Sequence, residues 1–282
     1  MGNSEELGLQ DTILGQSGKE VTIEEWIRKG IRGDSCIPNL REVGEIPSIT
    51  IVADTLPEGW ERATLACWFY GIPMRTQYDN PGDPPSRDCD IKIVIRQPYR
   101  EPKIHLCFPG GFGDLEVYRQ EVVDGIHDGW IDLTPGSTKW RYTYHQRLFE
   151  YNPSYPEEGP VIDQIEIMAR KLAEVPYTRR AQAITWYPRF DNDSDDPPCL
   201  QRIWARLVPI PIATAEKEVE VDSAKIYALN FHFYMRSWDS FKAAFMNLWA
   251  FLDLQLLLVA RINQLGRRTV PGSIVANADS FH

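Results

Sequence analysis

The chain has 282 residues, of which 43% are hydrophobic and 25% are charged, a balance typical of a globular protein with a sizeable core. The net charge of −10 argues against a nucleic-acid-binding surface, because phosphate backbones select proteins with a basic face. A small anionic ligand held by a few local arginines remains compatible with it. The apolar run at 248–260 is too short to span a bilayer, and the amino terminus lacks the apolar stretch of a signal peptide. We therefore expect a cytoplasmic protein that binds neither nucleic acid nor membrane.

The five cysteines are odd in number and widely spaced, and none forms a C-x-x-C pair. They are Cys36, Cys67, Cys89, Cys107 and Cys199. This pattern argues against a disulfide framework and against a structural zinc site. We expect no metal.

The first half of the chain combines strand and helix patterns. Residues 1–48 are polar and irregular, apart from a helix that should begin near Thr22. Strands are predicted over 48–53, 90–96 and 104–108, and helices over 21–29, 115–126 and 161–173. Residues 63–69 are a helix or a strand, and the Pro-, Gly- and Asp-rich segment 78–89 is predicted to be a loop.

The last third predicts strands over 181–187, 202–208 and 226–235, followed by a helix over 240–261 that is apolar nearly all round and therefore buried. Mixed strands with a few long helices, without a repeat or a linker, indicate one α+β domain spanning 1–282.

Cys199 follows two prolines, and this stiff, extended backbone fixes the direction of its sulfur. Taken alone, the pattern is more typical of a buried loop cysteine. Two basic pairs change the interpretation, since arginine presents a planar fork of donors that matches phosphate oxygens. Arg179-Arg180 precede the strand at 181–187, and Arg236-Ser237 follow the strand at 226–235.

These residues belong to a spaced pattern: R-R-x5-W-Y-P, then P-C, then Y-x-R-S-x-D, and an Asn early in an apolar helix. Its members are Arg179, Arg180, Trp186, Pro198, Cys199, Tyr234, Arg236, Ser237, Asp239 and Asn247. The pattern resembles thymidylate synthase, closely over the second half of the chain and faintly over the first. The resemblance implies that a mixed sheet forms a dimer interface and that a long helix is buried.

The resemblance also implies roles. Cys199 would add as a thiolate to carbon 6 of a pyrimidine nucleoside 5′-monophosphate, with Tyr144 in the position of a family tyrosine and nearby arginine charge helping to keep the sulfur deprotonated. Arg236 and Ser237 would bind the 5′-phosphate, Asn247 the base edge, His282 the sugar hydroxyl and Asp239 the folate pterin. Arg179 and Arg180 would reach the partner's site in an obligate twofold homodimer. The cosubstrate would be 5,10-methylenetetrahydrofolate.

Two further positions have alternatives. The family needs a glutamate that relays protons through water; we favour Glu121 over Glu116, because Glu-Val-Val resembles the family's Glu-Leu-Leu. A phosphate-binding arginine on an amino-terminal loop is assigned to Arg87, with Arg75 as the substitute.

Leu200 stands where many thymidylate synthases have His beside the nucleophile, and Met235 replaces a usual Gln. The family continues beyond the position of His282 into a tail that closes over the folate, so we expect that such a tail is missing from this sequence. An apolar Leu200 removes a restraint on the amide of Asn247, and cytosine needs the amide orientation opposite to that for uracil. These departures resemble the cytidylate hydroxymethylases of nucleoside-antibiotic pathways. The leading expectation is therefore CMP 5-hydroxymethylation.

The alternatives are a thymidylate synthase that converts dUMP to dTMP, a dCMP hydroxymethylase and a catalytically silent nucleotide-binding relative. A zinc-dependent deaminase is excluded, because Pro198-Cys199 lacks the second cysteine of P-C-x-x-C.

Overall fold

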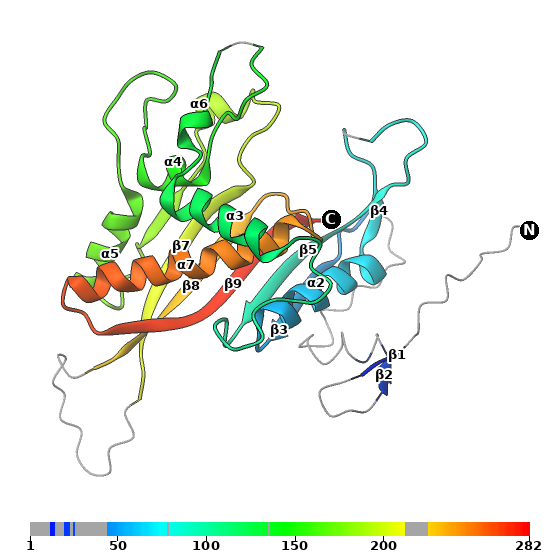
Figure 1. The fold of residues 1–282 in the computed structure, drawn as a ribbon, viewed down its shortest axis with the longest axis horizontal. Helices are drawn as coiled ribbons and strands as arrows, with labels where there is room; N and C mark the ends of the chain where they lie inside the picture. Colours follow the sequence, from blue (N-terminus) through cyan, green and yellow to red (C-terminus); the bar gives the residue numbers. More distant parts are fainter. Residues whose placement is uncertain are drawn as a thin grey trace, which may run out of the picture.

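The protein is described by a computed structural model over residues 12–14, 20–22, 25, 44–77, 79–134, 136–211 and 225–282. One mixed sheet organises it, with strand order β3-β5-β9-β8-β7-β6 and β4 paired to β5 (Figure 1). The strands are β3 Ser48–Ala53, β4 Ile72–Met74, β5 Ser86–Ile95, β6 Gln182–Ile184, β7 Leu200–Pro209, β8 Tyr227–Met235 and β9 Thr269–Phe281. The helices are α2 Leu56–Tyr70, α3 Phe112–Asp124, α4 Tyr144–Phe149, α5 Gln164–Glu174, α6 Pro188–Asp191 and α7 Ala243–Gln264, with a 3-10 turn, η2, at Asp128–Trp130.

Helices α2, α3 and α7 lie on one side of the sheet, with α7 running across β7, β8 and β9 (Figure 1). The burial pattern of the strands explains why the side of the sheet covered by these helices forms the core. Along β8, buried and half-buried residues alternate, so one side of the strand packs under α7 while the other stays partly open. The predicted α+β class is confirmed.

Helix α7 is long and apolar enough, by length and composition alone, to cross a membrane. It packs instead against α3, α5 and β9, and residues such as Phe245, Leu248 and Phe251 are fully buried in the core. The predicted buried helix is confirmed, with its start moved from 240 to Ala243.

Strand directions decide which residues meet at one edge of the sheet. β7 runs antiparallel to β8, β8 parallel to β9, and β9 antiparallel to β5. The start of β7, the ends of β8 and β9, and the start of β5 therefore share an edge, which we call the Cys199 edge. β6 is antiparallel to β7, so the residues before β6 lie toward the opposite edge.

Most predicted elements are present. The strand at 48–53 is β3, and the predictions at 90–96, 202–208 and 226–235 fall on β5, β7 and β8. The helices predicted at 115–126 and 161–173 correspond to α3 and α5, and residues 63–69 belong to α2.

Three predictions about elements need correction, and one strand was not predicted. Residues 104–108 form no strand, because the segment turns through a bond from Phe108 N to His105 O and leaves Leu106 fully exposed. The segment predicted as a loop at 78–89 ends early, since β5 begins at Ser86. The strand predicted at 181–187 is only Gln182–Ile184. β9, a central strand, had no prediction because its sequence contains Pro271 and Gly272, which disfavour strands.

Near the amino terminus, β1 Thr12–Leu14 and β2 Glu20–Thr22 pair antiparallel, where irregular structure was predicted. The Thr22 hydroxyl accepts from Glu25 N, and Thr22 N donates to the Glu25 carboxylate, which is the capping pattern expected at the predicted helix start. Most of the predicted helix at 21–29 lies outside the described residues.

Candidate active site

Cys199 lies immediately before β7, and the backbone around it is fixed by bonds from three directions. Its carbonyl accepts from Arg236 N at 2.9 Å. The next residue, Leu200, donates its N–H to the Tyr144 hydroxyl at 3.2 Å, and its carbonyl accepts from the Thr185 hydroxyl. A thiol held in this way needs little reorganisation before it reacts.

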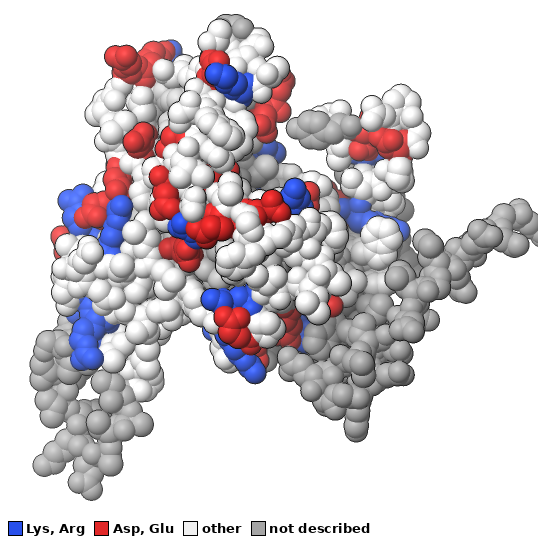
Figure 2. Space-filling model, viewed as in Figure 1, with Lys and Arg blue, Asp and Glu red and all other residues white. Residues whose placement is uncertain are grey.

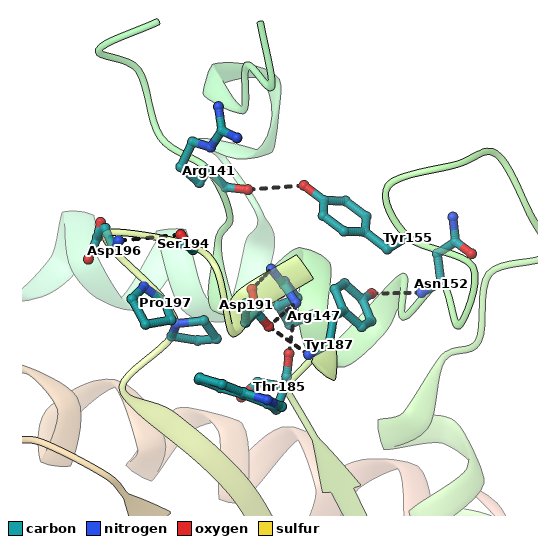
Figure 3. A network of polar contacts seen from close by, with 12 residues as sticks. Arg141, Arg147, Asn152, Tyr155, Thr185, Tyr187, Asp191, Ser194, Asp196 and Pro197 are labelled. Atoms are coloured by element: carbon teal, nitrogen blue, oxygen red, sulfur yellow. Dashed lines mark hydrogen bonds and ion pairs between the residues drawn. The ribbon is translucent and has the colours of Figure 1, made fainter. Parts of the chain in front are cut away.

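A buried ion pair supports this loop from behind (Figure 3). Arg147 is fully buried and donates two bonds of 2.9 Å to the Asp191 carboxylate. It also donates to the Thr185 carbonyl at 2.9 Å, and Asp191 accepts from Tyr187 N at 2.6 Å. The Thr185 hydroxyl in turn donates to the carbonyl of Leu200, so hydrogen bonds connect the ion pair to the residue that follows Cys199. Neither charged residue was predicted from the sequence, because a pairing across 44 positions leaves no local pattern.

The pKa of the Cys199 thiol is set by opposing effects. Burial raises the pKa of the thiol, the Arg236 charge lowers it, and Asp196 raises it again. Arg236 acts in the predicted direction and favours the thiolate, but the cost of desolvating the thiolate outweighs this effect, so the pKa of the thiol is raised overall.

Arg236 is half-buried beside this loop and anchors it. Its guanidinium donates to the carbonyls of Pro197 at 2.7 Å and Pro198 at 3.2 Å. Within the described ranges no carboxylate pairs with it, so its positive charge is uncompensated. Ser237, the next residue, is also half-exposed.

A cavity of about 210 Å³ opens next to Cys199. Its lining residues are Tyr118, Glu121, Trp140, Arg141, Tyr142, Thr143, Tyr144 and Asp196. A thiolate charge at Cys199 is among the causes that raise the pKa values of Tyr118, Tyr142 and Tyr144, which places all three hydroxyls within its field. The predicted catalytic residues Cys199, Glu121 and Tyr144 thus come together.

The two glutamates of α3 are in different surroundings. Glu121 lines the cavity, contacts His127 Nδ1 at 3.3 Å, and has its pKa raised by burial. Glu116 instead bonds to Arg119 at 2.9 Å, in a group of acidic side chains that Figure 2 shows over α3 and α7. Of the two candidates, only Glu121 faces the cavity.

An aromatic cluster that the sequence analysis missed adjoins Glu121. His127 stacks on Trp130 at 3.8 Å between ring centroids and meets Trp140 edge-on at 5.3 Å. Trp130 and Trp140 remain 52% and 37% exposed, which leaves aromatic surface open beside the cavity. The nine tryptophans of the chain indicated that a stacking surface was possible. The sequence could not show which of them would lie beside Glu121.

Asn247 lies in the first turns of α7 with both ends of its amide bonded. Its Oδ1 accepts from the Trp238 indole N–H at 2.8 Å, and its Nδ2 donates to the Tyr118 hydroxyl. The expectation that an apolar Leu200 leaves this amide free to turn is wrong, because Trp238 and Tyr118 hold it independently of Leu200.

Arg87 and His282 line a second, larger cavity of about 620 Å³, together with Thr64, Trp68, Phe241 and other residues. Arg87 lies in β5, not in the predicted loop, and donates to the Gly71 carbonyl at 3.2 Å. Both residues are on the Cys199 edge, but β5 and β7 are separated by two strands, about 14 Å between axes. Arg75, the substitute, is exposed and is not among the cavity's lining residues.

Arg179 and Arg180 are exposed and lie toward the opposite edge. Ala181 pairs with Ala205, six residues along β7 from Cys199, which is about 20 Å at strand spacing. The structure therefore does not bring these arginines to the Cys199 of their own chain.

Asp239 is exposed just before α7, and its Oδ1 accepts from the backbone N–H groups of Phe241 at 2.8 Å and Lys242 at 2.9 Å. The carboxylate thus caps the turn into the helix, and Oδ2 has no bond within the described part of the chain. No cluster of three His, Cys, Asp or Glu side chains in these same ranges is arranged to hold a metal ion.

Comparison with solved structures adds the fold family. The protein superposes on the thermostable thymidylate synthase A from Bacillus subtilis with a TM-score of 0.52, covering 80% of this chain and 79% of that one at 15% identity. The fold is of the thymidylate synthase type. At this identity the likeness concerns the fold alone.

Sequence comparison points the same way. The chain is 30% identical over 164 residues to a protein of Methanosarcina mazei named "Putative thymidylate synthase", covering 57% of this chain and 64% of that protein. A protein of the same name from Methanocaldococcus jannaschii is 42% identical over 101 residues, 34% of this chain and 39% of the relative. The match therefore spans less than two thirds of these thymidylate-synthase-like relatives. No family model matches the chain.

Proposed function

We propose that the protein transfers a one-carbon unit to carbon 5 of a pyrimidine nucleoside 5′-monophosphate through a covalent adduct on Cys199. The observation that carries this proposal is the juxtaposition of a fixed, half-buried thiol with a cavity lined by Glu121 and Tyr144 and with the unpaired guanidinium of Arg236. The fold and the named relatives support it.

In this reaction the Cys199 thiolate forms a bond to carbon 6, and the electron pair of the 5,6 double bond moves toward the oxygen or nitrogen on carbon 4. Carbon 5 becomes nucleophilic, and its proton later leaves to a base before the sulfur–carbon bond breaks again. Glu121, whose pKa is raised by burial, would exchange a proton near this part of the ring.

Substrate binding would use the uncompensated positive charge of Arg236. The phosphate dianion would bind Arg236 and Ser237, and the charge-assisted bonds would hold the guanidinium against the loop that carries the nucleophile. Asn247 would read the base, and Arg87 and His282 would contact the sugar and phosphate on the adjoining part of the edge.

Methylenetetrahydrofolate would supply the one-carbon unit when bound. The residues present suit a flat heteroaromatic ring, because Trp130 and Trp140 leave aromatic surface open beside Glu121, and Asp239 keeps one carboxylate oxygen for a ring N–H. These positions would hold the folate over the nucleotide.

The protein would act as a homodimer in the cytoplasm. Arg179 and Arg180 are too far from their own Cys199 to bind its nucleotide, yet they are exposed and unpaired with any described carboxylate. If two copies paired through the half-open faces of their sheets about a twofold axis, Arg179 and Arg180 of each copy would complete the phosphate site of the other.

Two finer reactions are supported by different observations. The departures at Leu200 and Met235 resemble the cytidylate hydroxymethylases and on that ground favour CMP 5-hydroxymethylation, in which water captures the methylene group; dCMP hydroxymethylation is its deoxy counterpart. The names of the relatives support the conversion of dUMP to dTMP, in which the folate supplies hydride.

The test is an exchange assay. CMP, dCMP and dUMP, each tritiated at carbon 5, are incubated with the protein and methylenetetrahydrofolate, and the products are identified by mass. We expect tritium release with a gain of CH2O or of CH2, which separates the two reactions. Tight nucleotide binding without any release, unaffected by Cys199→Ala, would instead show a silent binding protein.

A further inference from the structure

The orientation of the Asn247 amide is set by chemistry and not only by shape. An indole N–H is a donor and never an acceptor, so the atom 2.8 Å from Trp238 Nε1 must be Oδ1. Nδ2 is then the end that donates to the Tyr118 hydroxyl. If the amide were turned, Asn247 Nδ2 would face the Trp238 indole N–H, and two donors would oppose each other. Asn247 is only 4% exposed, so water could not relieve this contact.

Trp238 cannot move aside to permit such a turn. It is 1% exposed, packs edge-on against Phe233 and Phe281 with both ring centroids at 5.5 Å, and donates its backbone N–H to Ser280 O at 2.8 Å. The donor that orients Asn247 is thus anchored between β8 and the end of β9.

Asn247 keeps unused hydrogen-bonding capacity after these two bonds. An amide nitrogen carries two hydrogens and an amide oxygen has two lone pairs, and Tyr118 and Trp238 each use one. Within the described part of the chain, one donor at the Tyr118 end and one acceptor at the Trp238 end are left for a ligand.

The Tyr118 end lies on the side where the proposed chemistry takes place. Tyr118 lines the cavity with Glu121 and Tyr144, and the charge of Cys199 reaches its hydroxyl. In a base attached through carbon 6 to Cys199, carbon 4 adjoins the reacting carbon 5, whereas nitrogen 3 is opposite carbon 6. The amide donor therefore faces the group on carbon 4, and the amide oxygen faces nitrogen 3.

We propose that Trp238 and Tyr118 are positioning residues that hold Asn247 in the orientation that accepts uracil and rejects cytosine. Uracil presents a carbonyl oxygen at carbon 4 and an N–H at nitrogen 3, which complement the free donor and acceptor. Cytosine presents an amino group and a lone pair, and both contacts become repulsive. This inference rests on the proposed function, and it selects the uracil reaction from the two finer candidates.

The experiment measures kcat/KM for tritium release from UMP, CMP, dUMP and dCMP, so that bases are compared on the same sugar. We expect the wild type to prefer uracil by at least about a thousandfold, as sites that hydrogen-bond a substrate edge do. Trp238→Phe removes the donor and Tyr118→Phe removes one hydroxyl; each should lower this preference by about tenfold or more. The ratio is taken within one preparation, so it does not depend on the fraction of folded protein.

Trp249→Phe is the matched control. Trp249 lies two residues beyond Asn247 on α7 and packs edge-on against Phe112, without a bond to Asn247. The base preference of this variant should equal that of the wild type.

A wild type that prefers cytosine, or neither base, would overturn the inference while leaving the proposed function intact. An unchanged uracil preference in both Trp238→Phe and Tyr118→Phe would show that Asn247 is not held by these residues. Absence of release from all four nucleotides would reject the proposed function itself, and the base assignment with it.

Discussion

Arg147 and Arg236 both hold the chain around Cys199, but their surroundings are opposite. Arg147 is fully buried, its charge is neutralised by Asp191, and aromatic rings surround it, with Tyr187 at 3.9 Å from the guanidinium carbon to the ring centroid (Figure 3). Arg236 is half-exposed, and among the residues that the structure describes its guanidinium bonds to neutral carbonyls alone.

This difference separates a structural arginine from one that can bind a ligand. A fully buried guanidinium whose charge is neutralised by a carboxylate is not accessible to a substrate. A charge held on neutral carbonyls at the edge of a cavity keeps its attraction for an anion. Disrupting the first should affect folding, and disrupting the second should affect chemistry.

The largest effect on chemistry should come from Cys199→Ser. A hydroxyl at this position is a far weaker nucleophile, so tritium release should fall by about a thousandfold or more, while the melting temperature and nucleotide affinity change little. Cys107→Ser, at an exposed cysteine, should leave both unchanged. Retained release in Cys199→Ser would refute the nucleophile assignment.

The largest effect on stability should come from Arg147→Met, which leaves the Asp191 carboxylate buried and unpaired. We expect the free energy of unfolding in urea to fall by about 3–5 kcal/mol. Arg189→Met is the control, since its pair with Glu157 at 2.9 Å is exposed and should contribute less than about 1 kcal/mol. Equal losses in the two variants would contradict the contrast between buried and exposed pairs.

Arg236→Ala should raise the KM for the nucleotide by about 10- to 100-fold, because it removes charge-assisted bonds to a dianion. The loss of stability should be smaller than for Arg147→Met. Steady-state kinetics and urea melts on the same preparations would test both statements, with the exposed Arg100→Ala as the control. A stability loss as large as that of Arg147→Met would assign Arg236 a mainly structural role.

The remote arginines extend the comparison to a second subunit. Mixing Arg179→Ala subunits with Cys199→Ala subunits should restore about a quarter of the wild-type activity, because half the dimers are hybrids with one intact site each. Each variant alone should stay near its own low activity. If mixing restores nothing, the sites are not shared.

The smallest effect concerns the pH dependence of thiol reactivity. Because burial raises the pKa of Cys199, its thiolate fraction at neutral pH is low and rises with pH. Alkylation followed by peptide mass spectrometry should therefore reach half its maximal rate at a higher pH for Cys199 in the folded protein than for Cys199 in the urea-unfolded chain. Arg236→Gln should move the midpoint for folded Cys199 further up, since the guanidinium lowers that pKa. A midpoint lower in the folded protein than in the unfolded chain would contradict the assigned role of burial.

Much of the fold could be predicted from local pattern. The alternation at 48–53 and 202–208 and the apolar surface of α7 are properties of neighbouring residues, and the structure confirms them. The spacing from Arg236 to Asn247 also indicated the family resemblance, because an intact motif preserves relative positions along the chain.

The sequence by itself determined the α+β class, the strands with clear alternation and the residues from which a site could be built. Only the tertiary structure decided that β9 joins β8 to β5, that Glu121 rather than Glu116 lines the cavity, and that burial outweighs Arg236 at Cys199. It also decided the amide orientation of Asn247, through partners 9 and 129 positions away. Sequence patterns report which side of an element is apolar, whereas pKa values and hydrogen-bond partners depend on distances between residues that only folding brings together.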